Sequence, residues 1–310
     1  MTKHWTFKTR LGAGLAVAAL ALSACGGDGV ASDDADESSD ASGEKTLTFG
    51  VIPGWTDQTS TAYLLARILE DNGYTIKMTE LSDNGLMYTG LAQGDIDVLS
   101  SAWIERTHKP FMDQYGDDLA DLGVYYEGAD SFLAVPEYSD IKSIEDLPDH
   151  ADELNGTITG IEAGAGLTKL TQESVMPAYG LDSDFNLQLS STTAMLAELE
   201  KSIDKEAPIV VTLWSPFWAN QIYPVRALED PENAYGDPEN LHVLANKDLP
   251  DAQPEAVNML SNFTMTEEQF GSLENLVVNE FGQGNEPEAV DAWLKENPDF
   301  ETELAAYLKE

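Results

Sequence analysis

Short apolar runs alternate with amphipathic helical segments over most of this chain, and this alternation constrains the fold more than any other feature. In the first stretch, the pattern predicts strands at residues 47–52, 75–81 and 96–100. Helices are predicted between them, over residues 59–71 and 85–93. Strands that alternate with helices in this way form α/β units with a mostly parallel sheet. We therefore expect an α/β lobe here.

A second stretch of the chain repeats the same pattern. It predicts strands at residues 156–161, 187–189 and 208–213, with helices over residues 168–179 and 192–203. We expect a second α/β lobe from these residues.

Two further apolar runs, residues 131–135 and 241–245, lie at the junctions of these stretches, and the chain is helical after the second run. We interpret the two runs as crossover strands that join two lobes. Lobe 1 is predicted to comprise residues 45–135 and 244–310, and lobe 2 residues 136–243. A cleft between two lobes is a common place for a ligand.

The N-terminal segment predicts export. Residues 1–24 have a cationic start, an apolar run over residues 11–22 and small residues before the cleavage position, as in a signal peptide. Cys25 is the only cysteine of the chain, and its place after the run resembles a bacterial lipobox. We expect Cys25 to be lipidated, and residues 25–44 to form an acidic linker that holds the folded body at the outer face of the cell membrane. An ordinary secretory signal and an uncleaved anchor are the alternatives.

Composition excludes several classes of function. The 310 residues include 56 acidic and 16 basic side chains, which gives a formal charge of −40. Phosphate backbones repel such a surface, so nucleic-acid binding is not expected. A single cysteine excludes a disulfide framework, and four histidines leave little material for a metal cluster. We expect neither a metal nor a cofactor.

Three of the six tryptophans share a position relative to the predicted strands. Trp55 and Trp103 each come three residues after a strand of lobe 1, and Trp214 directly follows a strand of lobe 2. Ligands of open α/β sheets bind outside the carboxyl ends of the strands, so these rings are expected to converge on one cleft. The alternative is that each ring is simply a buried core side chain.

Three indole faces suit a particular chemical group. A quaternary ammonium cannot donate a hydrogen bond, so carboxylates alone hold it poorly in water. It is attracted instead to aromatic faces within about 6 Å, and each contact contributes roughly 0.5–2 kcal/mol. The three tryptophans therefore favour a quaternary-ammonium cage.

A zwitterionic ligand needs a second, anion-binding pole. The glycine-rich turn Gly160–Leu167 follows a predicted strand and opens a helix, so its backbone N–H groups and the helix dipole favour an anion. His108 follows Trp103 by five residues and is placed to donate a hydrogen bond to a carboxylate. Alone, such a turn is a weak signal, and a lone histidine is more often structural.

Taken together, these residues resemble the glycine betaine/proline betaine-binding proteins of bacterial ABC importers. The resemblance runs from about residue 46 to residue 308. Its most specific motifs are Gly54-Trp55-Thr56-Asp57, Ser101-Ala102-Trp103-Ile104, Thr107-His108, Ile144-Glu145-Asp146-Leu147, Gly160-Ile161-Glu162-Ala163-Gly164-Ala165-Gly166 and Val210-Val211-Thr212-Leu213-Trp214-Ser215-Pro216-Phe217-Trp218.

The resemblance implies a two-lobed periplasmic-binding-protein fold of type II, with the ligand in the cleft. In that family three tryptophans hold the trimethylammonium group, and the matching positions are Trp55, Trp103 and Trp214.

It also implies the groups that hold the ligand carboxylate. These are a histidine that matches His108 and backbone N–H groups that match Gly166 and Leu167. One departure concerns Phe217, where relatives commonly carry a histidine that we do not count among the ligand groups. This departure leaves open which betaine is preferred.

The leading hypothesis is therefore a monomeric binding lipoprotein without catalytic residues. It captures glycine betaine or a related osmoprotectant and delivers it to an ABC permease and its ATPase. A choline or carnitine binder is the main alternative. A hydrolase of small zwitterions is less favoured, because the sequence offers no nucleophile elbow and no cysteine in the folded body. A sensor of betaine is indistinguishable from a transporter at this level.

Overall fold

A computed structural model describes residues 45–309 of the chain. The predicted signal peptide, Cys25 and the acidic linker lie outside the described residues.

The described strands form one continuous sheet path, in the order β2-β1-β3-β9-β4-β7-β5-β6, with β8 paired to β4. The strands are β1 (Thr46–Val51), β2 (Thr75–Glu80), β3 (Val98–Ala102), β4 (Leu119–Pro136), β5 (Thr157–Thr159), β6 (Asn186–Gln188), β7 (Val211–Ser215), β8 (Val225–Ala227) and β9 (Glu239–Asn246).

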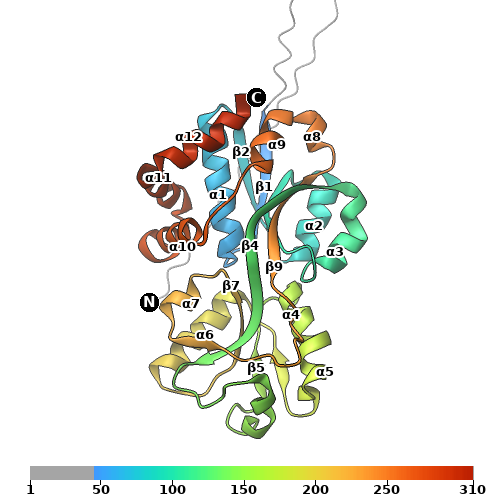
Figure 1. Ribbon diagram of the computed structural model, residues 1–310, viewed down its shortest axis with the longest axis vertical. Coiled ribbons are helices and arrows are strands. Elements are labelled where there is room, and N and C mark those ends of the chain that lie inside the picture. Colours follow the sequence, from blue (N-terminus) through green and yellow to red (C-terminus); the bar gives the residue numbers. More distant parts are fainter. Residues whose placement is uncertain (1–44, 310) are drawn as a thin grey trace, which may run out of the picture. The chain divides into compact units, whose positions relative to one another are not determined.

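Helices cover the sheet on both sides of this path (Figure 1). They are α1 (Thr56–Asp71), α2 (Asn84–Gln93), α3 (Lys109–Tyr115), α4 (Gly166–Leu170), α5 (Met176–Ala178), α6 (Thr192–Asp204), α7 (Ala219–Ile222), α8 (Leu249–Ala252), α9 (Pro254–Ser261), α10 (Glu267–Asn275), α11 (Glu286–Glu296) and α12 (Pro298–Ala306). Short 3₁₀ turns lie at Gly116–Asp118, Ile144–His150, Leu181–Ser183 and Tyr307–Lys309, and π-helical turns at Thr171–Val175 and Leu276–Phe281.

Strand β4 divides the fold into two lobes (Figure 1). Its residues 119–129 pair with β9, whereas residues 130–134 pair with β7 and residues 134–136 with β8. Lobe 1 contains β1, β2, β3, β9 and the first part of β4, with α1–α3 and α8–α12. Lobe 2 contains the end of β4 and β5–β8, with α4–α7. The lobe boundaries predicted at residues 135–136 and 243–244 fall within β4 and β9 and stay a prediction.

The sheet is parallel only in part, which corrects the expectation of mostly parallel units. In lobe 1, β1 pairs in parallel with β2 and β3, and in lobe 2, β5 does so with β6 and β7. All pairs that involve β4 or β9 are antiparallel. The predicted α/β fold of two lobes is nevertheless confirmed, since each lobe keeps a parallel centre flanked by helices.

Strand β4 is much longer than the predicted crossover at residues 131–135. Its first eleven residues carry Asp121 and Glu127, so they lack the continuous apolar run that indicates a buried strand. Asp121 is instead held at the strand surface by His242 of β9, with 2.9 Å between Oδ1 and Nδ1. Pairing with β9 therefore stabilises this part of β4 as a strand, although its sequence lacks a continuous apolar run.

Two tryptophans also lie differently from their predicted positions. Trp103 follows β3 directly, because β3 ends at Ala102. Trp214 is the fourth residue of β7, where it pairs with Ser131 of β4, and does not follow the strand. Both rings still lie near the carboxyl ends of their strands.

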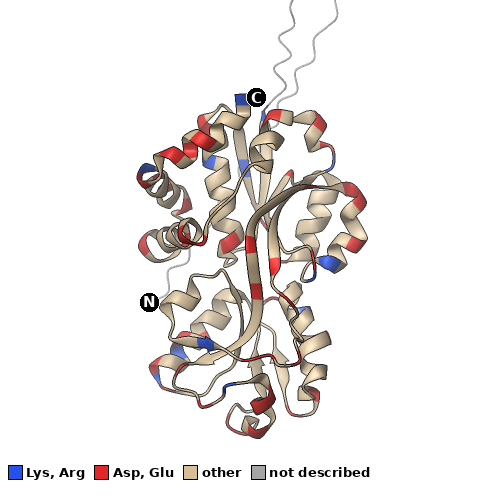
Figure 2. Ribbon diagram, viewed as in Figure 1, with Lys and Arg blue, Asp and Glu red and all other residues tan. Residues whose placement is uncertain are grey.

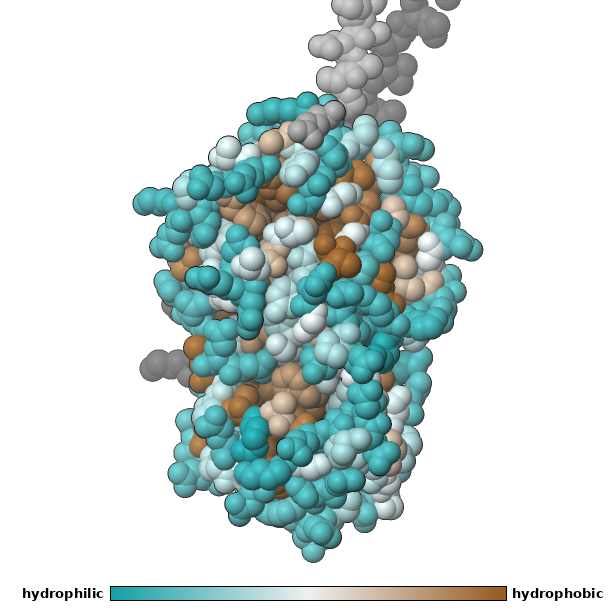
Figure 3. Space-filling view, in the orientation of Figure 1, coloured by the Kyte–Doolittle hydropathy of each residue, from teal (hydrophilic) through white to brown (hydrophobic). Residues whose placement is uncertain are grey.

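The surface of the described residues is strongly acidic. Asp and Glu residues are frequent on the outer helices of both lobes, and Lys and Arg residues are few (Figure 2). The face in Figure 3 is mostly hydrophilic, with apolar residues gathered in smaller areas. Within residues 45–309, no helix is long and apolar enough to cross a membrane.

Candidate functional site

A cavity between the two lobes collects every predicted ligand-binding residue. Trp55, Trp103, His108, Gly166, Leu167 and Trp214 all line it. Asp57, Ser101, Thr107, Ser131, Ile161 and Ala165 complete the lining. The empty space among these residues, including the part open to solvent, is about 410 Å³. The structure thus brings the six residues together, while their roles in ligand binding stay predictions.

The three tryptophans reach the cavity from three different elements. Trp55 caps the N-terminus of α1, Trp103 follows β3, and Trp214 belongs to β7. All three rings are buried. Large aromatic surfaces from both lobes therefore face one space.

Hydrogen bonds at the ring edges orient two of the indoles. Trp55 Nε1 donates to Glu162 Oε2 at 3.1 Å, and this bond joins lobe 1 to lobe 2. Glu162 also accepts from the backbone N–H and the hydroxyl of Thr192, at 2.7 and 2.9 Å. Trp103 Nε1 lies 3.4 Å from Asp57 Oδ2. Sequence reasoning noted Glu162 only as part of a motif and assigned it no role.

Phe217 supports Trp214 from outside the cavity. The two rings stack with centroids 4.0 Å apart and an angle of 20° between their planes. Phe217 is buried and does not line the cavity. The departure from the family pattern at residue 217 therefore changes the ring that packs against Trp214.

His108 is buried, with only 3% of its surface exposed, and burial lowers its pKa to about 3 because the charged ring would lose its hydration. The backbone N–H of Trp103 donates to Nδ1 at 3.2 Å, and Tyr88 Oη lies 3.0 Å from the same nitrogen. Because Nδ1 accepts a hydrogen bond, the neutral ring carries its proton on Nε2.

That proton faces the side-chain amide of Asn84, whose Nδ2 lies 2.8 Å from Nε2. Turning the amide by 180° would bring Asn84 Oδ1, which has no hydrogen-bond partner, toward the proton. Both nitrogens of His108 therefore have protein partners. A hydrogen bond from His108 to a ligand carboxylate requires the ring to exchange Asn84 for the ligand.

Gly166 and Leu167 begin helix α4. Their backbone N–H groups have no acceptor within the helix, as in any first helical turn. A Cβ atom on Gly166 would lie 2.1 Å from the carbonyl oxygen of Thr107, which belongs to lobe 1. Glycine is therefore required for the lobes to approach here.

Asp57 is a cavity residue that sequence reasoning missed. It is 4% exposed, and Ser101 Oγ donates to its Oδ2 at 2.7 Å. Burial raises the pKa of this carboxyl, and its hydrogen bonds oppose the shift. No Lys or Arg is among the residues that line the cavity. The signal was present in the motif Gly54–Asp57, but 56 acidic residues gave no reason to select this one.

Comparison with known proteins supplies the family context. Residues 45–296 match the family described as the substrate binding domain of ABC-type glycine betaine transport system. The chain is 40% identical over 152 residues to the glycine betaine/carnitine transport binding protein GbuC of Listeria monocytogenes, and the alignment covers 49% of each protein. The match thus spans about half the length of that curated relative.

Two solved structures are similar over most of the chain. The closed-liganded structure of lactococcal OpuAC with glycine betaine has a TM-score of 0.77 at 30% identity, and the match covers 84% of this chain and 98% of that one. An ABC-transporter choline binding protein in complex with choline has a TM-score of 0.76 at 26% identity, covering 86% and 97%.

Proposed function

Since this chain belongs to the family of substrate-binding domains of ABC-type glycine betaine transport systems, we propose that it captures glycine betaine or a closely related quaternary amine for import. The chain has the two-lobed, type II periplasmic-binding-protein fold. Its partners would be a membrane permease and the ATPase that drives it. Members of such a family act outside the cytoplasm.

The observation that carries this proposal is the convergence of Trp55, Trp103 and Trp214 on one cavity. Indole faces attract a quaternary ammonium through the ring quadrupole, and the attraction strengthens when water is excluded. The carboxylate of Asp57 lies beside Trp103 and adds negative potential at the same pole. A methylated cation would thus be held by shape, by ring faces and by one buried charge.

The carboxylate of a betaine would point toward the opposite pole. There the N–H groups of Gly166 and Leu167 are the donors that the chain offers, together with His108 after exchange of its bond to Asn84. This assignment is supported by the place of all three residues in the cavity lining.

Closure of the lobes would complete the site. The Trp55–Glu162 hydrogen bond and the approach of Gly166 to Thr107 both join lobe 1 to lobe 2 at the cavity. Binding proteins of two lobes close over their ligand by a hinge motion. No covalent chemistry is part of this proposal, and the protein would act without catalytic residues.

We further propose that Cys25 carries the lipid anchor and that the protein works as a monomer. The excess of acidic over basic residues, visible in Figure 2, suits solubility beside a membrane in high external salt.

Calorimetric titration with glycine betaine, and with choline as comparison, tests the proposal. One-to-one betaine binding, accompanied by a change in tryptophan fluorescence, is the expected result. Choline binding with no response to betaine would favour the choline binder. If neither ligand binds, the proposal of a quaternary-ammonium site is refuted.

His108→Ala is expected to weaken glycine betaine binding about tenfold more than choline binding. Choline has no carboxylate, so it loses no partner when the imidazole is removed, whereas a charge-assisted hydrogen bond contributes about 1.5–3 kcal/mol. The ratio of the two dissociation constants measures the effect. Equal losses would show that His108 acts only through its contacts with Tyr88 and Asn84.

His108 itself should add no pH dependence to the affinity between pH 5 and 8, since with a pKa of about 3 it remains neutral throughout this range.

Asp57→Asn is expected to act in the opposite direction, with choline losing about tenfold in affinity and betaine less. The buried carboxylate attracts the cationic head of both ligands, but it also repels the carboxylate of a betaine. Removing the charge therefore lowers the affinity for a zwitterionic betaine less than the affinity for the cation choline. The same pair of titrations measures this, and an equal or larger loss for betaine would contradict it.

A further inference from the structure

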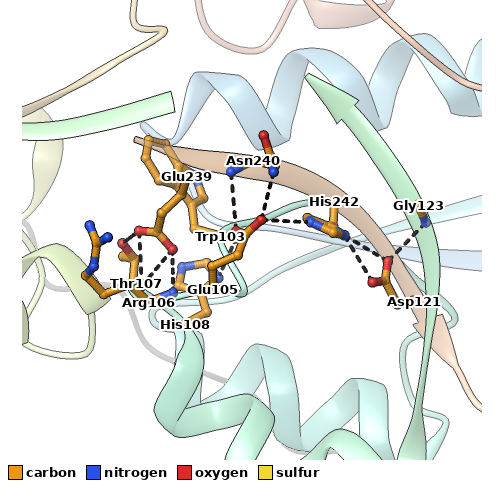
Figure 4. Close-up of polar contacts among 10 residues, drawn as sticks. All are labelled: Trp103, Glu105, Arg106, Thr107, His108, Asp121, Gly123, Glu239, Asn240 and His242. Carbon is orange, nitrogen blue, oxygen red and sulfur yellow. Dashed lines mark hydrogen bonds and ion pairs between the residues drawn. The ribbon is translucent and has the colours of Figure 1, made fainter. Parts of the chain in front are cut away.

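Two carboxylates join the cavity segment, residues 103–108, to the start of strand β9 (Figure 4). One belongs to β9 and accepts hydrogen bonds from the cavity segment. The other belongs to the cavity segment and accepts hydrogen bonds from β9. We call this reciprocal arrangement of Glu239 and Glu105 the carboxylate clamp.

Glu239 supplies the buried half of the clamp. It is 4% exposed, and its Oε1 accepts from the backbone N–H groups of Arg106 and Thr107 at 2.6 and 3.0 Å. The hydroxyl of Thr107 donates to Oε2. One carboxylate thus accepts hydrogen bonds from three donors that belong to two adjacent residues. Burial raises the pKa of Glu239 and these hydrogen bonds oppose the shift, so the bonds offset part of the cost of burying the charge.

Glu105 supplies the outer half. Its Oε1 accepts from the side-chain amide of Asn240 at 3.0 Å and lies 3.2 Å from Nε2 of His242. The other nitrogen of His242 contacts Asp121 of β4. The cavity segment is therefore connected to both crossover strands.

The clamp lies where the two lobes separate. Glu239 pairs with Ala129 of β4, and the next residue of β4, Asp130, already pairs with Ser215 of lobe 2. Arg106 also crosses to the chain that leads into β9, because its guanidinium donates to the carbonyl oxygens of Tyr235 and Asp237. A change in the angle between the lobes would thus act on Glu239 and its partners.

At its other end the cavity segment carries the ligand-facing groups. Thr107 lines the cavity and its carbonyl oxygen faces Gly166 of lobe 2. The N–H of His108 donates to the carbonyl of Trp103 at 2.7 Å, which closes the segment into a tight turn. Holding Thr107 therefore fixes the neighbouring His108 as well.

We propose that Glu239 is a positioning residue that ties the cavity segment to the hinge end of β9, so that lobe closure and assembly of the ligand site occur together. This inference rests on the proposed function, because it concerns binding of a quaternary amine in the cavity. Glu239 itself does not line the cavity and acts through Thr107 and His108.

Glu239→Gln tests the proposal, since it keeps the size of the side chain but leaves one acceptor oxygen for three donors. Glycine betaine affinity is expected to fall about 30-fold, consistent with the loss of charge-assisted hydrogen bonds of about 2 kcal/mol. Choline affinity should fall less, because His108 is placed at the pole predicted for a carboxylate. In the ligand-free protein, the amides of Arg106 and Thr107 should exchange with deuterium at least tenfold faster.

Glu286→Gln is the matched control. Glu286 is also buried and accepts a backbone hydrogen bond, from Gly284, but it does not line the cavity. It should keep the affinity for both ligands and the exchange rates of the clamp. Glu239→Asp retains the charge with a shorter reach, so an intermediate loss of affinity is expected, and it replaces the Gln variant if that variant does not fold.

Three results distinguish the possible failures. A wild-type protein that binds neither ligand refutes the proposed function. Wild-type binding together with unchanged affinity in Glu239→Gln, measured well below its melting temperature, overturns the positioning role. Equal losses for betaine and choline, or unchanged exchange at Arg106 and Thr107, would reduce Glu239 to a purely structural residue and likewise overturn the proposal.

Discussion

Trp103→Ala is expected to weaken glycine betaine binding at least ~100-fold, which would be the largest effect on affinity of any single change in the cavity. The truncation removes both the ring face, worth about 2 kcal/mol for a desolvated cation, and most of the contact area of the residue. Trp103→Leu, which restores apolar volume without a ring, should lose ~30-fold. Trp103→Phe keeps a smaller aromatic face and should lose less than tenfold. Titration of the four proteins measures the series.

A matched ligand separates charge from shape in the same experiment. The anion 3,3-dimethylbutyrate has a carbon atom in place of the ammonium nitrogen of glycine betaine, so it has nearly the same shape without the positive charge. Wild-type protein should bind it ~100-fold more weakly, and Trp103→Leu should narrow this difference. Trp293→Phe, a change in the core at α11, should leave both affinities unaltered. A Leu variant as tight as the Phe variant would contradict a cation–π cage.

The sequence predicted the parts of the fold that depend on local periodicity. Helices α1 and α6 were predicted within three residues at either end, because their apolar residues recur at the helical period. Strand β4 was recognised only at its end, because pairing with β9 stabilises its acidic first part. Such pairing is a tertiary contact that local composition does not record.

The residues of the cavity were also predicted only in part, because several of them meet only through tertiary contacts. Tryptophan is rare, so three at strand ends were informative, and all three line the cavity. Asp57 and Glu239 were not selected, because carboxylates are the commonest charged groups in this chain. The partners of His108 could not be predicted either, since Tyr88 and Asn84 come from α2 and meet the ring only in the folded lobe.

Another buried carboxyl lies behind the cage and is expected to control stability. Glu274 of α10 is 1% exposed, and the hydroxyl of Thr56 donates to its Oε1. Burial raises its pKa to about 8, and the neighbouring charge of Asp57 adds to the shift. At neutral pH this carboxyl is therefore mostly protonated, which avoids a second negative charge next to Asp57.

The pKa of Glu274 makes stability depend on pH in a defined direction. The folded protein binds the proton more tightly than the unfolded chain, in which a glutamate titrates near pH 4.3. This contribution to stability is fully present below about pH 4.5 and is lost as the pH rises to about 8. His108 affects stability over a different pH range. Because its pKa in the folded protein is about 3, its contribution to stability is present above pH 6.5 and is lost as the pH falls toward 3.

Glu274→Gln is expected to remove the alkaline loss of stability, because an amide cannot ionise. Between pH 6 and pH 8 the wild-type protein should lose about 2–3 kcal/mol relative to the variant, at about 1.4 kcal/mol per pH unit. This corresponds to a melting temperature roughly 5–10 °C higher for the variant at pH 8.5 than for the wild type. At pH 5 the two proteins should melt within a few degrees of each other, and calorimetric melting curves across this range measure the difference. Glu286→Gln makes the same chemical change elsewhere and should run parallel to the wild type. A constant difference between Glu274→Gln and wild type at every pH would mean that Glu274 does not titrate in this range, and the cage would then have two ionised carboxylates behind it.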